Sequence, residues 1–169
     1  MALLDAEEIR MNWQQVLEDK SLQDLQYKIE LNRLGQIVMS PAKNRHAILQ
    51  GQIVHLLGGL VTEGRTFPEC AIDTSDNVKV ADVVWVSAAR YAIIKAEDCC
   101  SIAPEICVEV KSSSNTMEEM HLKKELYLQK GAVEFWLCDE KGNMSFYNKD
   151  GKLTNSLLLP GFPAHVDME

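Results

Sequence analysis

A short apolar segment, residues 104–114, limits the folds open to this chain because it carries an acid and a base near its end. Its sequence, Pro-Glu-Ile-Cys-Val-Glu-Val-Lys-Ser-Ser-Ser, predicts a strand. Side chains alternate along a strand, so we expect Glu109 and Lys111 on one face and Ile106, Val108 and Val110 on the other. Burying a lone charge is very unfavourable, so this pair must meet each other, a metal ion, or water at an open strand end.

A second charge interrupts an apolar run earlier in the chain. Residues 78–86 predict a strand covered on both faces, and Asp82 lies within it. If the two strands are neighbours, Asp82 and Glu109 can bind one hard cation, and Mg²⁺ prefers such oxygen ligands together with water and substrate phosphate. A lysine beside them would orient or deprotonate an attacking water and stabilise developing charge, which describes phosphodiester hydrolysis. The alternative is a structural network of ion pairs among Asp82, Glu109 and Lys111.

The rest of the chain predicts helices and strands in a mixed order. One or two short helices are expected over residues 9–25, and a β-hairpin over 27–31 and 36–39. A helix over 42–58 and a second hairpin, 66–75 and 79–87, precede a less regular connection over 88–101 with a helical turn at 91–95. After the Glu109 strand, a capping box opens a helix over 116–130, and strands follow at 133–138, at 144–147 and after Leu153.

Two of the predicted helices carry polar residues four positions apart. His46 and Gln50 share a face of the first long helix, where a polar helix surface is the favoured interpretation and a contribution to a site is the alternative. Glu119, Lys123 and Tyr127 form one ridge on the later helix. This ridge is either an ordinary surface pairing or, if the helix packs beside the sheet end, a source of a lysine for the carboxylates.

Composition indicates one soluble globular domain. The chain has 169 residues, of which 46% are hydrophobic and 25% charged, so wholesale disorder is excluded. Its net charge of −8 disfavours casual nucleic-acid binding, although a local cluster of cations or a divalent metal can reverse the potential where it matters. Five cysteines without a C-x-x-C motif favour a reducing cytoplasm. We expect no signal peptide in residues 1–10, which are acidic, and no membrane span.

The order of these segments resembles the PD-(D/E)XK nuclease superfamily, and more narrowly the Uma-two family of restriction endonuclease-like proteins. The resemblance covers nearly the whole chain from Tyr27 onward. The matching segments and residues are 27–31, 35–41, His46, 80–86, 104–112, Lys123, Tyr127 and 131–136. The resemblance implies an α/β fold with a restriction endonuclease-like core: a mixed sheet flanked by helices, with an N-terminal β-hairpin. It places residues 1–169 in a single domain, with residues 1–26 as a helical extension.

The same resemblance implies roles for individual residues. Asp82 and Glu109 become ligands of Mg²⁺ or Mn²⁺, with the backbone carbonyl of Val110 as a further ligand. Lys111 occupies the position of the catalytic lysine, but that position is often apolar in the family, and the lysine matching Lys123 then substitutes for it. Both lysines are present here, so the choice between them stays open.

His46, Gln50 and Tyr127 are candidate accessory residues. The chain departs from the family pattern at Ala81 and Ser113, where proline is usual, and neither position is a ligand.

Two functions from different classes follow. The first is a Mg²⁺-dependent endonuclease in the cytoplasm with DNA as substrate, for which a homodimer is the default because duplex DNA has two strands. The second is a catalytically inactive protein of the same fold that acts as a binding or assembly module, which the acidic balance favours. A cysteine-based enzyme has little support, because the four histidines, His46, His55, His121 and His165, show no spacing that points to a cysteine partner.

Overall fold

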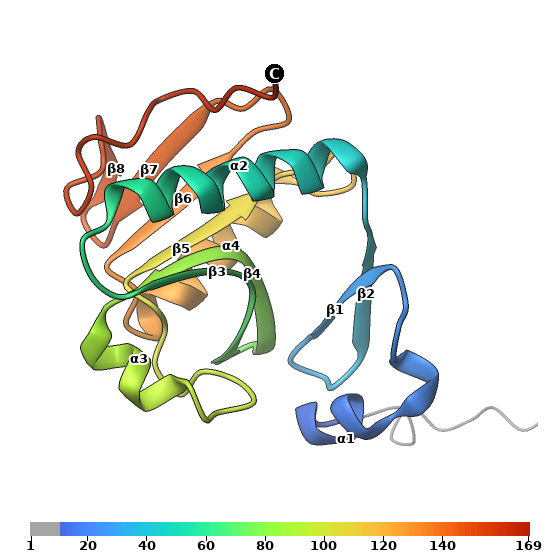
Figure 1. The fold of residues 1–169 in the computed structure, drawn as a ribbon. Coiled ribbons are helices and arrows are strands. Elements are labelled where there is room, and N and C mark those ends of the chain that lie inside the picture. Colours follow the sequence, from blue (N-terminus) through green and yellow to red (C-terminus); the bar gives the residue numbers. More distant parts are fainter. Residues whose placement is uncertain (1–10) are drawn as a thin grey trace, which may run out of the picture.

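The structure, a computed structural model, describes residues 11–169 as two sheets with helices around them (Figure 1). The elements in order are α1 (Trp13–Glu18), the 3₁₀ helix η2 (Lys20–Leu22), β1 (Tyr27–Leu31), β2 (Ile37–Pro41), α2 (Asn44–Leu60), β3 (Arg65–Thr74), β4 (Asn77–Val86), α3 (Ala88–Ile94), β5 (Ile106–Val110), α4 (Met117–Gln129), β6 (Glu134–Cys138), β7 (Met144–Asn148) and β8 (Gly151–Leu153).

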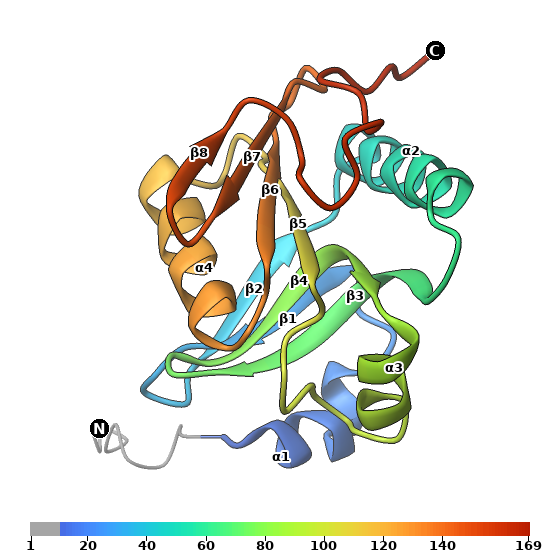
Figure 2. The same cartoon turned by 90° about the vertical axis from the view of Figure 1, so that its left-hand side faces the viewer.

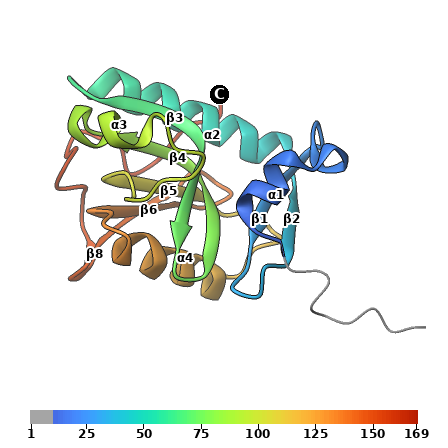
Figure 3. The same ribbon diagram turned by 90° about the horizontal axis from the view of Figure 1, so that it is seen from below.

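The main sheet contains six strands in the order β3-β4-β5-β6-β7-β8. Every neighbouring pair is antiparallel except β5 and β6, which are parallel and are connected through α4. Helices α2 and α4 lie on opposite sides of this sheet, as Figures 2 and 3 both show. The result is the mixed α/β fold that the sequence predicts.

Each face of the sheet has its own apolar core. On the α2 side, Leu49, Ile53 and Leu57 pack against alternate residues of β5 such as Val108. On the α4 side, Met120 and Tyr127 pack with Cys107 and Phe135. Strand β5 is therefore buried along its whole length, which explains why its sequence is almost purely apolar.

Local sequence signals account for several element ends. Thr116 and Glu119 form the reciprocal hydrogen bonds of a capping box at the start of α4, as predicted. Gly131, with φ of 107°, follows that helix. Asn77 adopts φ of 66° at the turn between β3 and β4, where its side chain accepts a hydrogen bond from the backbone N–H of Val78.

The N-terminal hairpin β1–β2 is a separate two-stranded sheet that is attached to β4. The Glu30 carboxylate accepts a 2.7 Å hydrogen bond from the backbone N–H of Val80, and the Lys79 ammonium donates to the Leu31 carbonyl at 2.7 Å. Both Glu30 and Lys79 are buried. These bonds fix the hairpin beside the first half of β4, on the right in Figure 1.

Within residues 11–169, none of the helices is both long enough and apolar enough to cross a membrane. The helical segment predicted over residues 9–25 corresponds to α1 and η2. Its first two residues lie outside the part of the chain that the structure describes.

Candidate active site

The two carboxylates of interest lie where β4 and β5 separate. These strands pair at Val83–Val108, Val84–Cys107 and Trp85–Ile106, and the ladder ends there. The next position in the same register would bring Asp82 opposite Glu109. Two apolar strands thus hold two acids side by side at the point where their backbones part. Both side chains are buried, with 1% and 2% of their surface exposed.

A break in the β3–β4 ladder lies at the same level. Strands β3 and β4 pair on both sides of this point, but Asp82 does not pair with Glu69, the residue opposite it. Glu69 has a φ of 56°. The Gln50 side-chain amide bonds to both residues, donating to the Asp82 carbonyl at 3.0 Å and to the Glu69 carboxylate at 2.7 Å. Since an unpaired backbone carbonyl is costly when buried, the Gln50 hydrogen bond to the Asp82 carbonyl stabilises this break in the ladder.

Three donors surround the Asp82 carboxylate. The Lys28 ammonium lies 2.9 Å from Oδ1, while Oδ2 is 3.2 Å from His46 Nε2 and accepts a 2.7 Å hydrogen bond from the backbone N–H of Val110. Burial alone would raise the pKa of Asp82, but Lys28 and His46 outweigh it and hold the pKa well below its usual range. The hydrogen bond to Asp82 also raises the pKa of His46. Asp82 is therefore held in its ionised form.

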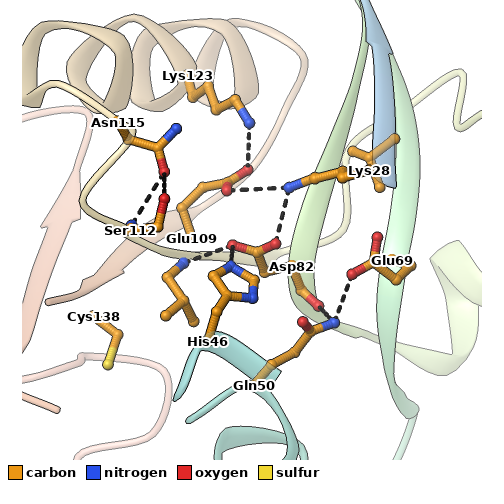
Figure 4. A network of polar contacts seen from close by, with 12 residues as sticks. Lys28, His46, Gln50, Glu69, Asp82, Glu109, Ser112, Asn115, Lys123 and Cys138 are labelled. Carbon is orange, nitrogen blue, oxygen red and sulfur yellow. Dashed lines mark hydrogen bonds and ion pairs between the residues drawn. The ribbon is translucent and has the colours of Figure 1, made fainter. Parts of the chain in front are cut away.

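Glu109 has a different set of partners. The Tyr127 hydroxyl donates to Oε1 at 2.7 Å, and the Lys123 ammonium lies 3.3 Å from the same oxygen. The Lys28 ammonium is 3.5 Å from Oε2. Burial raises the pKa of Glu109 to about 7, against the opposing effect of Lys123 and Lys28, with the neighbouring Asp82 adding to the rise. Figure 4 shows Lys28 reaching between the two acids from the hairpin.

Glu30 completes the network from the hairpin side. Its Oε2 atom lies 2.9 Å from the Lys123 ammonium, so Lys123 bridges Glu30 and Glu109. Burial would raise the pKa of Glu30, but Lys123 and Lys28 hold it below the usual value. The position of Lys123 is thus fixed from two elements, the hairpin and β5.

Asp82, Glu109 and their lysine partners open into a cavity of about 280 Å³, called here the main cavity. It is enclosed by the hairpin, the first turns of α2, β3, β4, the end of β5 and α4. Its lining includes Lys28, His46, Gln50, Glu69, Asp82, Glu109 and Lys123. Buried charges that face a cavity of this size are accessible to a small polar ligand.

The donor set of this cavity fits a hard cation. Asp82 and Glu109 offer carboxylate oxygens on two sides of one point, and the Lys28 ammonium is a positive group held between them. In residues 11–169, no group of three or more His, Cys, Asp or Glu side chains is arranged around a common metal position. Two protein carboxylates suit Mg²⁺ or Mn²⁺, which keep several waters, better than a metal that requires a complete protein cage.

Comparison of this sequence with models of known protein families identifies the family to which the chain belongs. A family model described as "Putative restriction endonuclease", Uma2, matches residues 14–158 and so spans most of the chain and every residue of the main cavity. The chain belongs to the Uma2 family. A search of curated protein sequences gives no match.

A solved structure supports the same fold. The chain is similar to a putative nuclease belonging to DUF820 from Anabaena variabilis, with a TM-score of 0.59 and 20% sequence identity over 80% of this chain and 74% of that one. At this identity the likeness concerns the fold. It agrees with the restriction endonuclease-like core that the sequence predicts for a Uma2 protein.

Lys111 does not lie where the sequence placed it in this Uma2 chain. Strand β5 ends at Val110, so the alternation that put Glu109 and Lys111 on one face stops one residue too early. The Lys111 ammonium is 3.4 Å from the Ser112 carbonyl, and its side chain lines a different cavity. Of the two candidate lysines, Lys123 is the one that contacts Glu109.

The helix residues also differ from their favoured interpretation. His46 and Gln50 were expected on a polar helix surface, but both line the main cavity and contact Asp82. The reason is the apolar stripe of α2: packing Leu49 and Ile53 against the sheet turns the adjacent positions toward β4.

The remaining candidates lie on α4 and at the end of β5. Tyr127 is fully buried on the sheet-facing side of α4 and contacts Glu109. The alternative interpretation of its ridge placed a lysine beside the carboxylates, and Lys123 lies 3.3 Å from Glu109. Val110 contacts Asp82 through its backbone N–H, and a role for its carbonyl as a metal ligand stays a prediction.

Sequence reasoning missed Lys28, Glu30 and Glu69. The first two lie on β1, whose alternating pattern gives no sign that the hairpin docks on β4. The alternation in residues 27–31 puts Lys28 and Glu30 on one face of the strand, but it does not show what that face contacts. Glu69 lies in β3 with no signal of its positive φ.

Proposed function

We propose that this Uma2 protein is a metal-dependent endonuclease that hydrolyses DNA phosphodiester bonds. Membership of a family of restriction endonuclease-like proteins supports a nuclease-like function. The observation that carries the finer proposal is the placement of Asp82 beside Glu109 at the parting of two buried strands, facing a cavity. Buried acids with opposed pKa shifts in a cavity are typical of catalytic sites.

Asp82 and Glu109 would hold Mg²⁺ or Mn²⁺ on the side now contacted by Lys28, which has to withdraw from between them. The metal, when bound, supplies Lewis-acid stabilisation of the charge that develops on the phosphoryl group. His46 and the Val110 N–H fix one carboxylate through hydrogen bonds. These bonds keep the Asp82 oxygens oriented toward the cavity, and such supporting contacts are a common requirement of metal sites.

Lys123 is the lysine that we assign to the reaction. In hydrolysis, a water oxygen bonds to phosphorus while an ester P–O bond breaks, and the leaving alkoxide takes up a proton. Lys123 lines the main cavity and is held by Glu30 and Glu109, so its ammonium is positioned to orient the water and to stabilise phosphoryl charge. Tyr127 positions Glu109 by donating to the oxygen that also faces Lys123.

A direct test uses a fluorescent DNA duplex and a supercoiled plasmid with Mg²⁺, Mn²⁺ or EDTA. Cleavage is expected with either metal and is expected to stop with EDTA. Lys123→Met is expected to lower kcat by roughly 100-fold, in line with the loss of one preorganised stabilising group. Asp73→Asn, at a half-exposed carboxylate of β3 outside the cavity, is the matched control for purification and should cleave normally. Metal-independent cleavage by clean protein would overturn the proposal.

The second candidate is a binding or assembly module without catalysis, and Lys28 is the observation that favours it. An ammonium that already pairs with both acids can neutralise the site as a permanent internal ion pair. Calorimetry with Mn²⁺ separates the two functions. Binding of one Mn²⁺ per chain supports the nuclease, and no binding by the folded protein supports the module.

Two further properties follow from the sequence argument. We place the protein in the cytoplasm, where its five free thiols would stay reduced. We also propose that it acts as a homodimer, because two sites related by a two-fold axis match the two strands of a duplex. Light scattering at micromolar concentration tests the dimer, with a mass near 19 kDa as the contrary result.

A further inference from the structure

A second cavity, of about 190 Å³, adjoins the main cavity beside the start of α2. We call it the side cavity. The two cavities share four lining residues, so they lie side by side with a common wall. The shared residues are Lys43, His46, Val110 and Ser112.

The charged side chains that line the side cavity are mostly cations. Lys43, Arg45 and Lys111 line it, and Glu140 is the single acid there. The chain as a whole has 25 acidic and 17 basic residues, so three cations against one acid reverse the overall balance at this place. Lys43 also contacts the Ser113 hydroxyl, which ties the start of α2 to the loop after β5.

The start of α2 adds further positive potential. Lys43 is the N-cap residue of this 17-residue helix and makes no side-chain capping hydrogen bond. The first turn of α2 contains no acidic residue. Its backbone N–H groups therefore add partial positive charge next to the ammonium and guanidinium groups that line the side cavity.

We infer that the side cavity binds a backbone phosphate of the DNA substrate, next to the phosphate that enters the main cavity. This inference rests on the proposed nuclease function. Lys43, Arg45 and Lys111 neutralise the phosphate charge, and the shared wall of the two cavities sets the register between the bound phosphate and the scissile one. Lys111 thus acts in binding the substrate, at a distance from the carboxylates, while Lys123 serves the reaction.

The test compares two triple variants that remove equal charge. Lys43→Gln, Arg45→Gln and Lys111→Gln together empty the side cavity of cations. Lys20→Gln, Lys149→Gln and Lys152→Gln remove three exposed lysines that line neither cavity. Binding of a fluorescein-labelled 20-base-pair duplex is measured by anisotropy in Ca²⁺ at several salt concentrations, and circular dichroism confirms that both variants are folded.

The side-cavity variant is expected to bind the duplex about 10- to 100-fold more weakly than the control variant at low salt. The slope of log affinity against log salt should decrease in magnitude by roughly 1, because one phosphate contact is lost and each contact contributes about 0.9 for B-form DNA. Equal affinities and equal slopes for the two variants would overturn the inference.

Different results would contradict the nuclease function and the phosphate site. If the wild type cleaves DNA but the two triple variants bind alike, the nuclease stands and the side cavity has no role in binding. If the wild type binds the duplex with the expected dependence on the side cavity but never cleaves it, the phosphate site stands and the nuclease falls. Absence of any duplex binding by the wild type contradicts the phosphate site.

Discussion

Glu109 on β5 and Glu134 on β6 are both acids buried within apolar strands, and their surroundings differ completely. Glu134 is 1% exposed, and its four hydrogen bonds all come from neutral donors. The donors are Trp136 Nε1, Ser156 Oγ and the backbone N–H groups of Leu157 and Leu158, at 2.7–2.9 Å. Glu109 instead has two lysines, a tyrosine and a cavity in front of it.

Burial of a charge does not by itself identify a functional residue. Glu134 is a closed structural site that fastens the segment after β8 to the sheet. Its charge is dispersed by hydrogen bonds that fully occupy its oxygens. At Glu109 the compensating groups are themselves charged and accessible. Charged partners and an open face toward a cavity therefore distinguish Glu109 from the structural anchor at Glu134.

The largest effect is expected from the two acids of the main cavity. Asp82→Asn or Glu109→Gln should lower metal-dependent cleavage by at least about 1,000-fold, because each change weakens the metal interaction that stabilises phosphoryl charge by several kcal/mol. Single-turnover cleavage of a labelled duplex measures this. Circular dichroism should show that both variants remain folded. Cleavage by either variant within tenfold of the wild type would show that these acids, like Glu134, have only a structural role.

Glu134→Ala should lower the stability of the fold and leave cleavage unchanged. The change leaves four buried or half-buried donors without an acceptor, so the free energy of unfolding should fall by about 3 kcal/mol. Urea denaturation gives this value. Cleavage per folded molecule should match the wild type. A loss of activity without a loss of stability would show that Glu134 belongs with Glu109 after all.

Lys28→Met tests the role of the ammonium that lies between Asp82 and Glu109. Without the ammonium, we expect Mn²⁺ to bind about tenfold more tightly and the metal-free protein to become less stable, because two buried carboxylates lose their counter-ion. Calorimetry and thermal unfolding with and without Mn²⁺ measure both effects. Lys130→Met, at a lysine outside the main cavity that pairs with Asp73, is the control and should leave Mn²⁺ affinity unchanged.

The smallest effects are expected from removing one hydroxyl donor at Glu109 and one at Glu134. Tyr127→Phe removes the donor to Glu109 and should lower cleavage about tenfold, as loss of an orienting hydrogen bond near a metal site does. Ser156→Ala removes one donor to Glu134 and should cost about 1 kcal/mol of stability with no change in cleavage. Equal effects of both changes on cleavage would contradict the comparison.

The sequence predicts much of this fold because many of its signals are local. The capping box at Thr116 and Glu119 and the turn at Asn77 act over a few residues, so their elements lie close to the predicted positions. The mixed sheet and the N-terminal hairpin also agree with prediction. Asp82 and Glu109 were found together because each interrupts an apolar strand.

The parts that prediction missed depend on contacts between distant segments. Lys28 reaches the acids only because the hairpin docks on β4, and no pattern within residues 27–31 encodes that contact. Lys111 was misplaced because the strand ends one residue before it. Glu134 shows the same local pattern as Glu109, and the difference between them comes from donors about twenty residues further along the chain.

The hairpin that carries Lys28 and Glu30 is a wall of the main cavity but has no strand in common with the six-stranded sheet. Such an arrangement allows the hairpin to change in sequence without loss of the stability that the main core provides. Substitutions at its exposed positions, such as Tyr27 and Met39, can reshape the entrance while the main core stays intact. A family built on this plan can change what it admits to the site by exchanging a single small sheet, without redesigning the scaffold that holds the acids.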